Sequence, residues 1–126
     1  VLPGTGGTQR LARLVGHQKA MRWMMEGHTG PLEEALTEGI VDHVFAGDRD
    51  AFLAQVLAYA GRFTSPAAAP MALGAIKRAV QGGASLPLEQ GLALERELQA
   101  RLFASEDCAE GLEAYLDKRP PRFTGR

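Results

Sequence analysis

The sequence has 126 residues, of which 45% are hydrophobic, so it suits one domain or a piece of a larger one and argues against intrinsic disorder. Its 14 Lys and Arg residues nearly balance 15 Asp and Glu residues, which gives no electrostatic reason to expect nucleic acid or an anionic membrane as a partner. No apolar run is long enough to span a bilayer, and the single Cys108 predicts a reducing compartment, the cytoplasm.

The first 47 residues open on a glycine-rich turn and then show helical spacing of apolar residues. The expected helices span residues 8–15, 18–26 and 32–38. Gly16 is expected to end the first as a left-handed cap, Gly27 to stop the second, and Pro31 to suit the first turn of the third. Residues 40–45, IVDHVF, are rich in β-branched side chains and predict one short strand.

The remainder of the chain is predicted to be entirely helical. The expected helices span residues 50–63, 66–81, 87–104 and 106–119. Asp48 or Asp50 could cap the first of them, and Ser65 is expected to cap the second, with Pro66 at its first position. Pro70 either lies in the early part of this helix, where proline is tolerated, or splits the segment. Ser105 is expected to cap the last helix, which Pro120 would stop. The apolar faces expected to be covered carry Leu73, Ile76, Val80, Leu88, Leu92, Leu94, Leu98, Leu102, Cys108, Leu112, Tyr115 and Leu116.

The glycine-rich turn has two interpretations. Gly4, Gly6 and Gly7 before a helix could expose backbone amides that bind a phosphate or a carboxylate, or they could make a tight connection and nothing more. The turn is not a P-loop, because no Gly-Lys-Ser/Thr follows it. It does not fit the dinucleotide fingerprint either, because Gln9 stands where the third glycine belongs.

The titratable side chains predict no metal site and no acid–base pair. The histidines are 11 and 15 residues apart, a spacing that no short metal motif uses, so each is expected on the surface or in a loop. Carboxylates one or two residues apart on a helix do not face each other, so they predict solvated faces. These carboxylates are Glu33, Glu34, Glu95, Glu97, Glu106 and Asp107. Cys108 has no adjacent histidine and is interpreted as a core thiol.

The positive residues of the tail, YLDKRPPRF, also have two interpretations. Lys118, Arg119 and Arg122 near a helix end complement the negative end of the helix dipole. Alternatively, together with Tyr115, they form a clamp for an anion such as a phosphate.

Three stretches together resemble a known family. PGTGGTQRLARLVG at 3–16, EGIVDHVF at 38–45 and SEDCAEGLEAYLDKRPPRF at 105–123 resemble the C-terminal part of the enoyl-CoA hydratase/isomerase (crotonase) family, in the same order and at similar spacings. The resemblance implies a mainly α fold, the helical C-terminal segment of a crotonase-like α/β fold, with at most one short strand. It implies that residues 1–47 hold the end of the core and a pocket loop, and residues 48–126 a helical region for oligomerisation and cover.

The resemblance also implies a function. Proteins of this family polarise an acyl-CoA thioester with two backbone amides while a glutamate moves a proton. These groups would precede Val1, so no catalytic residue is expected in this chain, and the isolated chain is expected to be inactive. Gly4, Tyr115 and Lys118 match substrate-binding positions. Coenzyme A would enter as part of the substrate with no other cofactor and no metal, in a homotrimer or a dimer of trimers. The alternative is a non-catalytic helical interaction module derived from the same family.

One stretch departs from the family pattern. Where relatives usually have G-D-x-x-x-A-x-E-A, this chain reads GHTGPLEEA at 27–35, which keeps Gly27, Glu34 and Ala35 but places His28 and Leu32 out of pattern. The resemblance implies that this loop helps to shape the acyl pocket. The acyl group and the choice between hydratase and isomerase are therefore left open.

Overall fold

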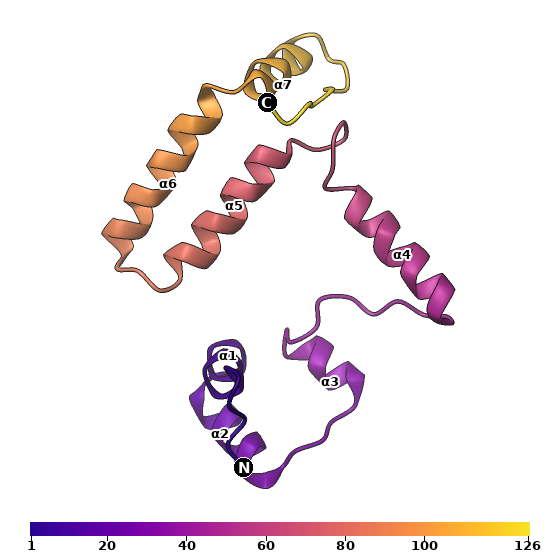
Figure 1. Cartoon of the computed structure of the whole chain (residues 1–126), viewed down its shortest axis with the longest axis vertical. Coiled ribbons are helices and arrows are strands. Elements are labelled where there is room, and N and C mark those ends of the chain that lie inside the picture. Colours follow the sequence, from indigo (N-terminus) through magenta and orange to yellow (C-terminus); the bar gives the residue numbers. More distant parts are fainter. The chain divides into compact units, whose positions relative to one another are not determined.

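The computed structural model describes all 126 residues and divides into two compact units, Val1–Asp48 and Arg49–Arg126. The fold is mainly helical, as predicted, with seven helices and no strand (Figure 1). None of these helices is both long enough and apolar enough to span a lipid bilayer. The helices are α1 (Gly7–Val15), α2 (His17–Glu26), α3 (Leu32–Thr37), α4 (Arg49–Gly61), α5 (Pro70–Gly83), α6 (Leu88–Phe103) and α7 (Glu106–Leu116).

In the first unit, α1 and α2 pack against each other around Ala20, which has no exposed surface. Gly16 joins the two helices with φ 84° and ψ 156°. The prediction of a left-handed cap at Gly16 is therefore wrong in detail, because this ψ lies far from the left-handed helical region. The observed backbone conformation is essentially restricted to glycine, so Gly16 sets the sharp turn between the helices.

The short strand predicted over residues 40–45 is wrong. Residues 41–46 are neither helix nor strand. A strand needs a neighbouring strand to complete its hydrogen-bond ladder, and the chain contains none. β-Branched residues alone therefore do not make a strand here.

The start of α3 also differs from the prediction. Pro31 is the N-cap of α3 and does not lie in its first turn.

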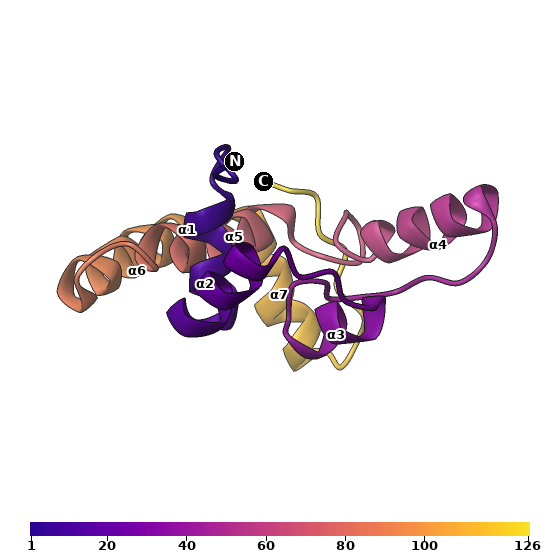
Figure 2. The same ribbon diagram turned by 90° about the horizontal axis from the view of Figure 1, so that it is seen from below.

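In the second unit, α5 and α6 form a helical hairpin whose arms lie side by side in both views (Figure 1 and Figure 2). The two helices approach closely where Gly83 faces Gly91, since a Cβ on Gly91 would lie 3.9 Å from the Cα of Gly83. Leu98 of α6 is buried, and α7 packs on the same helix.

Two predicted helix boundaries in this unit need correction and one cap is confirmed. Ser65 does not cap α5, which begins at Pro70 with Ala69 as its N-cap. α7 ends at Leu116, before Pro120 can stop it. Ser105 does cap α7, because its Oγ accepts a hydrogen bond from the backbone N–H of Cys108 at 3.1 Å. The prolines therefore indicated roughly where a helix starts or ends, but they did not predict the exact first or last residue of α5 and α7.

Most of the apolar faces that the sequence places under cover are exposed within their own unit. Of the hydrophobic residues in α5, α6 and α7, only Leu98 and Ala114 are buried. Val80 is 67% exposed, Leu88 76% and Leu116 78%. Helical periodicity identified these faces but could not show what covers them. An exposed apolar surface of this kind is typical of an interaction surface.

Candidate functional site

The glycine-rich turn is the first part of the candidate site. Residues 4–6 form a turn in which the N–H of Gly6 donates to the carbonyl oxygen of Gly4, and Gly6 then adopts φ 91° as the N-cap of α1. A Cβ on Gly4 would meet nothing closer than the carbonyl oxygen of Leu2, at 4.0 Å. The chain itself leaves room for a side chain at this exposed position. The surrounding residues of the chain therefore do not themselves require glycine at position 4.

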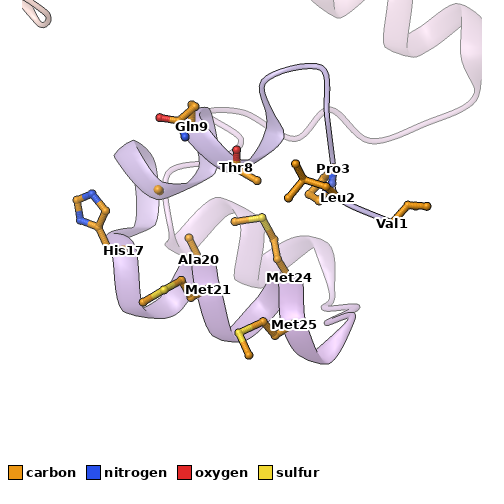
Figure 3. A pocket seen from close by; sticks show the side chains of 11 residues that line it. Val1, Leu2, Pro3, Thr8, Gln9, His17, Ala20, Met21, Met24 and Met25 are labelled. Atoms are coloured by element: carbon orange, nitrogen blue, oxygen red, sulfur yellow. The ribbon is translucent and has the colours of Figure 1, made fainter.

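A cavity of about 510 Å³ adjoins this turn and is mostly apolar (Figure 3). The segment before Gly4 forms one side of it, and α2 supplies three methionines to the other. Met24 extends from α2 toward the segment that carries Leu2 and Pro3. Methionine adapts its shape readily, so this wall suits an apolar group of variable form. The lining residues are Val1, Leu2, Pro3, Thr8, Gln9, Ala12, His17, Ala20, Met21, Met24 and Met25.

Tyr115 and Lys118 lie together at the C-terminal end of α7, in the second unit. Tyr115 is 82% exposed, and Lys118 is also exposed. Lys118 has φ 53°, the left-handed conformation that glycine usually supplies after a helix. The N–H of the next residue, Arg119, donates to the carbonyl oxygen of Ala114 at 3.0 Å, which completes this helix end. Lys118 therefore holds a strained backbone position while its ammonium faces solvent.

The tail after α7 folds back along the helix and is held by Asp107. This side chain is only 5% exposed. Its carboxylate accepts hydrogen bonds from the backbone N–H groups of Thr124 at 2.7 Å and Gly125 at 2.9 Å. The prediction that Asp107 belongs to a solvated face is thus wrong, because the returning tail supplies donors and covers it.

Glu110, one turn further along α7, holds the middle of the tail. Its two carboxylate oxygens accept from the two terminal nitrogens of Arg119 at 2.7 and 2.9 Å. The backbone N–H of Arg122 adds a third bond at 2.7 Å. The Arg119 hydrogen bonds, followed by the Arg122 N–H, lower the pKa of Glu110 from 4.5 to about 2. We call Asp107, Glu110 and the tail groups that they bind the tail clasp.

The contacts of the tail clasp reduce the set of residues that could bind an anion as the sequence suggested. The two terminal nitrogens of Arg119 already donate to Glu110, which raises the pKa of the guanidinium, so this arginine is committed to the fold of the tail. Tyr115 and Lys118, three residues apart in sequence, are both exposed. Sequence reasoning missed the roles of Asp107 and Glu110, because the partners lie 9 to 18 residues away along the chain. The only signal was a run of carboxylates ahead of a basic, proline-containing tail.

Gly4 and the pair of Tyr115 and Lys118 lie in different units. Tyr115 and Lys118 lie at the same end of α7, whereas Gly4 lies in the glycine-rich turn before α1. Glu34 was also expected on a solvated helix face. Its side chain is only about one third exposed, and its Oε2 forms a hydrogen bond with His28 Nε2 at 2.9 Å. Residues 1–126 contain no cluster of three or more His, Cys, Asp and Glu side chains arranged to hold a metal ion.

Comparison with known proteins identifies close relatives over the whole chain. The chain is 40% identical to the 2,3-dehydroadipyl-CoA hydratase of Escherichia coli strain K12, over 100% of this chain and 48% of that protein. It is 34% identical to the mitochondrial methylglutaconyl-CoA hydratase of Mus musculus, over 99% of this chain and 40% of that protein. The chain thus spans about half the length of the curated relatives it matches.

Solved structures show the same relationship. An enoyl-CoA hydratase structure from Geobacillus kaustophilus HTA426 matches with a TM-score of 0.91 and 41% identity, over 100% of this chain and 46% of that chain. An enoyl-CoA hydratase structure from Bacillus anthracis matches with a TM-score of 0.86 and 29% identity, over 100% of this chain and 47% of that chain. The family model for enoyl-CoA hydratase/isomerase matches residues 1–126. The chain therefore belongs to the enoyl-CoA hydratase/isomerase family.

Proposed function

We propose that the chain is the C-terminal portion of an enzyme of this family that acts on acyl-CoA thioesters. The observation that carries the proposal is the family match over residues 1–126 at about half the relatives' length. The C-terminal placement is supported by the motifs at 3–16, 38–45 and 105–123, which follow the order of that part of the family. In this proposal residues 1–47 contribute the end of the core and a pocket loop, and residues 48–126 contribute cover and assembly.

The proposed contacts to substrate come from three positions. The exposed backbone at Gly4 would face the reacting end of the substrate, where the absence of a side chain permits close approach. Tyr115 and Lys118 would contact the coenzyme A portion bound by a neighbouring subunit. An exposed aromatic face suits an adenine ring and an ammonium suits a phosphate, which is the chemistry that coenzyme A offers.

Assembly into a homotrimer or a dimer of trimers is the second part of the proposal. It is supported by the apolar faces of α5, α6 and α7, which their own unit leaves exposed. Apolar helix faces of this extent need a partner to remove them from water. We assign that partner to the remainder of the enzyme and to further copies of it.

The chemical step would be divided between this chain and residues outside it. Polarisation of the thioester by two backbone amides and proton transfer by a glutamate must act together to stabilise the enolate-like transition state. We place both outside these 126 residues, so the chain by itself would not turn over substrate. Coenzyme A would be part of the substrate, with no separate cofactor.

The test compares this 126-residue chain with the longest natural form of the protein that contains it. Both are assayed for hydration of crotonyl-CoA and of 2,3-dehydroadipyl-CoA, and for coenzyme A binding by calorimetry. Hydration by the natural form alone supports the proposal. Turnover by the 126-residue chain would contradict the placement of the catalytic groups, and Glu33 and Glu34 would then be the first carboxylates to substitute. A natural form that binds partners without turnover would favour the non-catalytic interaction module.

A further inference from the structure

α3 is attached to the rest of its unit by side chains rather than by close helix packing. The helix pairs that pack closely are α1 with α2, α5 with α6, and α6 with α7. α3 and its C-cap are held to α2 and the residue beyond its C-cap by two polar contacts. Lys19 Nζ forms an ion pair with Glu38 Oε2 at 2.6 Å, and His28 Nε2 forms a hydrogen bond with Glu34 Oε2 at 2.9 Å. The Trp23 ring stacks on His28 with centroids 4.7 Å apart, and Lys19 Nζ lies 5.7 Å from its centroid. We call these five side chains the α2–α3 latch.

The C-terminal cap of α2 places His28 in the latch. Gly27 adopts φ 63° and ψ 41°, and the N–H groups of Gly27 and His28 both donate to the carbonyl oxygen of Trp23. In this type of helix end, the second residue beyond the helix commonly packs on the residue that accepts the bond. Here that contact is the stack of His28 on Trp23. The same glycine that stops the helix therefore aims the imidazole at α3.

Gly30 completes the arrangement. A Cβ at position 30 would overlap the Oε2 of Glu34 and would lie 2.9 Å from the Nε2 of His28. Any side chain at this position would force the two partners apart. Glycine at position 30 thus leaves the space that the hydrogen bond between His28 and Glu34 occupies, although its backbone is not in the left-handed region.

The residue type at position 28 decides whether the hydrogen bond to Glu34 can form. An aspartate in place of His28 would set a second carboxylate toward Glu34, and like charges at this separation repel each other. Only a donor at position 28 can close the pair, and His28 supplies one through Nε2–H.

We propose that the α2–α3 latch is a conformational device that fixes α3 and the preceding loop, residues 28–31, on α2, with the residue at position 28 controlling local opening. The side chains of both polar contacts, Lys19 with Glu38 and His28 with Glu34, are about one quarter to one third exposed, so neither contact alone is strong. The segment opens locally when the latch fails, while the helices that pack closely stay folded. This device does not depend on the acyl-CoA activity proposed above.

Hydrogen exchange measured by mass spectrometry tests the latch in the longest natural form of the protein. His28→Asp should speed exchange of the α3 amides at 32–38, whose intrinsic rates the substitution leaves unchanged. The loss of the hydrogen bond corresponds to an increase of about two- to twelvefold, with the added repulsion acting in the same direction. Glu34→Ala should have the same effect. Glu34→Gln keeps an acceptor and should restore most of the protection.

Glu33→Gln is the matched control, because it removes one carboxylate from the same helical turn without touching the latch. It should leave the exchange of residues 32–38 unchanged. The proposal is overturned if His28→Asp and Glu34→Ala also leave it unchanged. It is equally overturned if exchange rises as much in α5 and α6 as in α3, since the latch would then contribute to global stability and not to local opening. Gly30→Ala should match His28→Asp.

Discussion

The carboxylate of Glu110 and the guanidinium of Arg119 form a two-pronged ion pair, with nitrogen–oxygen distances of 2.7 and 2.9 Å, between α7 and the tail that follows it. This geometry matches the fork of the arginine to both oxygens of the carboxylate, which is the strongest arrangement of the two groups. It also fixes the chain just beyond Lys118. The helix end that carries Tyr115 and Lys118 is therefore held by the ion pair of Glu110 with Arg119.

Glu110→Gln should lower the thermal unfolding midpoint of the protein. The amide oxygen of glutamine can keep the two bonds that Oε1 accepts from Arg119 and Arg122, but the amide nitrogen cannot accept the bond that Oε2 accepts from Arg119. Circular dichroism measures the midpoint, and Glu113→Gln is the control. Glu113 is 71% exposed, and its Oε2 lies 4.0 Å from the nearest Arg119 nitrogen, too far for a hydrogen bond. Its substitution should therefore have little effect. Equal effects of both substitutions would show that the fork does not hold the tail.

The Glu110 carboxylate should make stability depend on pH in the acid range. Its pKa is lowered from 4.5 to about 2 in the folded protein, so folding favours the ionised form. The contribution is complete above pH 4.5 and is lost as pH falls toward about 2. Urea unfolding between these pH values should bring wild type and Glu110→Gln closer together as the solution is acidified. A gap that stays constant would argue against the lowered pKa.

Ser105→Ala should destabilise the protein by about 1 kcal/mol, the usual cost of removing an N-cap side chain. The Oγ that accepts from the Cys108 N–H is lost, and no other side chain caps α7. Denaturant unfolding measures the change. Ser85→Ala, at an exposed position between α5 and α6, is the control and should be close to neutral.

Lys118→Gly should stabilise the helix end and weaken coenzyme A binding at the same time. Relief of the left-handed backbone strain at φ 53° should contribute about 0.5–1 kcal/mol. Lys118→Ala removes the same ammonium without relieving the strain. Both variants should lose coenzyme A affinity equally in calorimetry, while only the glycine variant gains stability. Unchanged affinity in both would remove Lys118 from the proposed substrate contacts.

Local patterns in the sequence predicted the approximate positions of the helices but not the contacts that the helices make. Gly27 stopped α2 and Ser105 capped α7 as predicted, because caps are made by neighbours in the chain. Ser65 looked like an equally good cap, yet α5 begins at Pro70. The local signals differ, because Pro70 lies within the segment that Ser65 would cap and has no N–H to donate to the carbonyl oxygen four residues earlier, which fits a helix that begins at this proline.

By itself, the sequence determined that the chain is helical, where most helices lie, and which family its motifs resemble. Periodicity and caps depend on residues that are close together in the sequence, and the motif order is visible directly along the sequence. The tertiary structure alone decided that residues 41–46 form no strand, that Asp107 is buried and that His28 closes on Glu34. Each of these depends on which distant group supplies or withholds a hydrogen-bond partner. Only the folded chain fixes that choice.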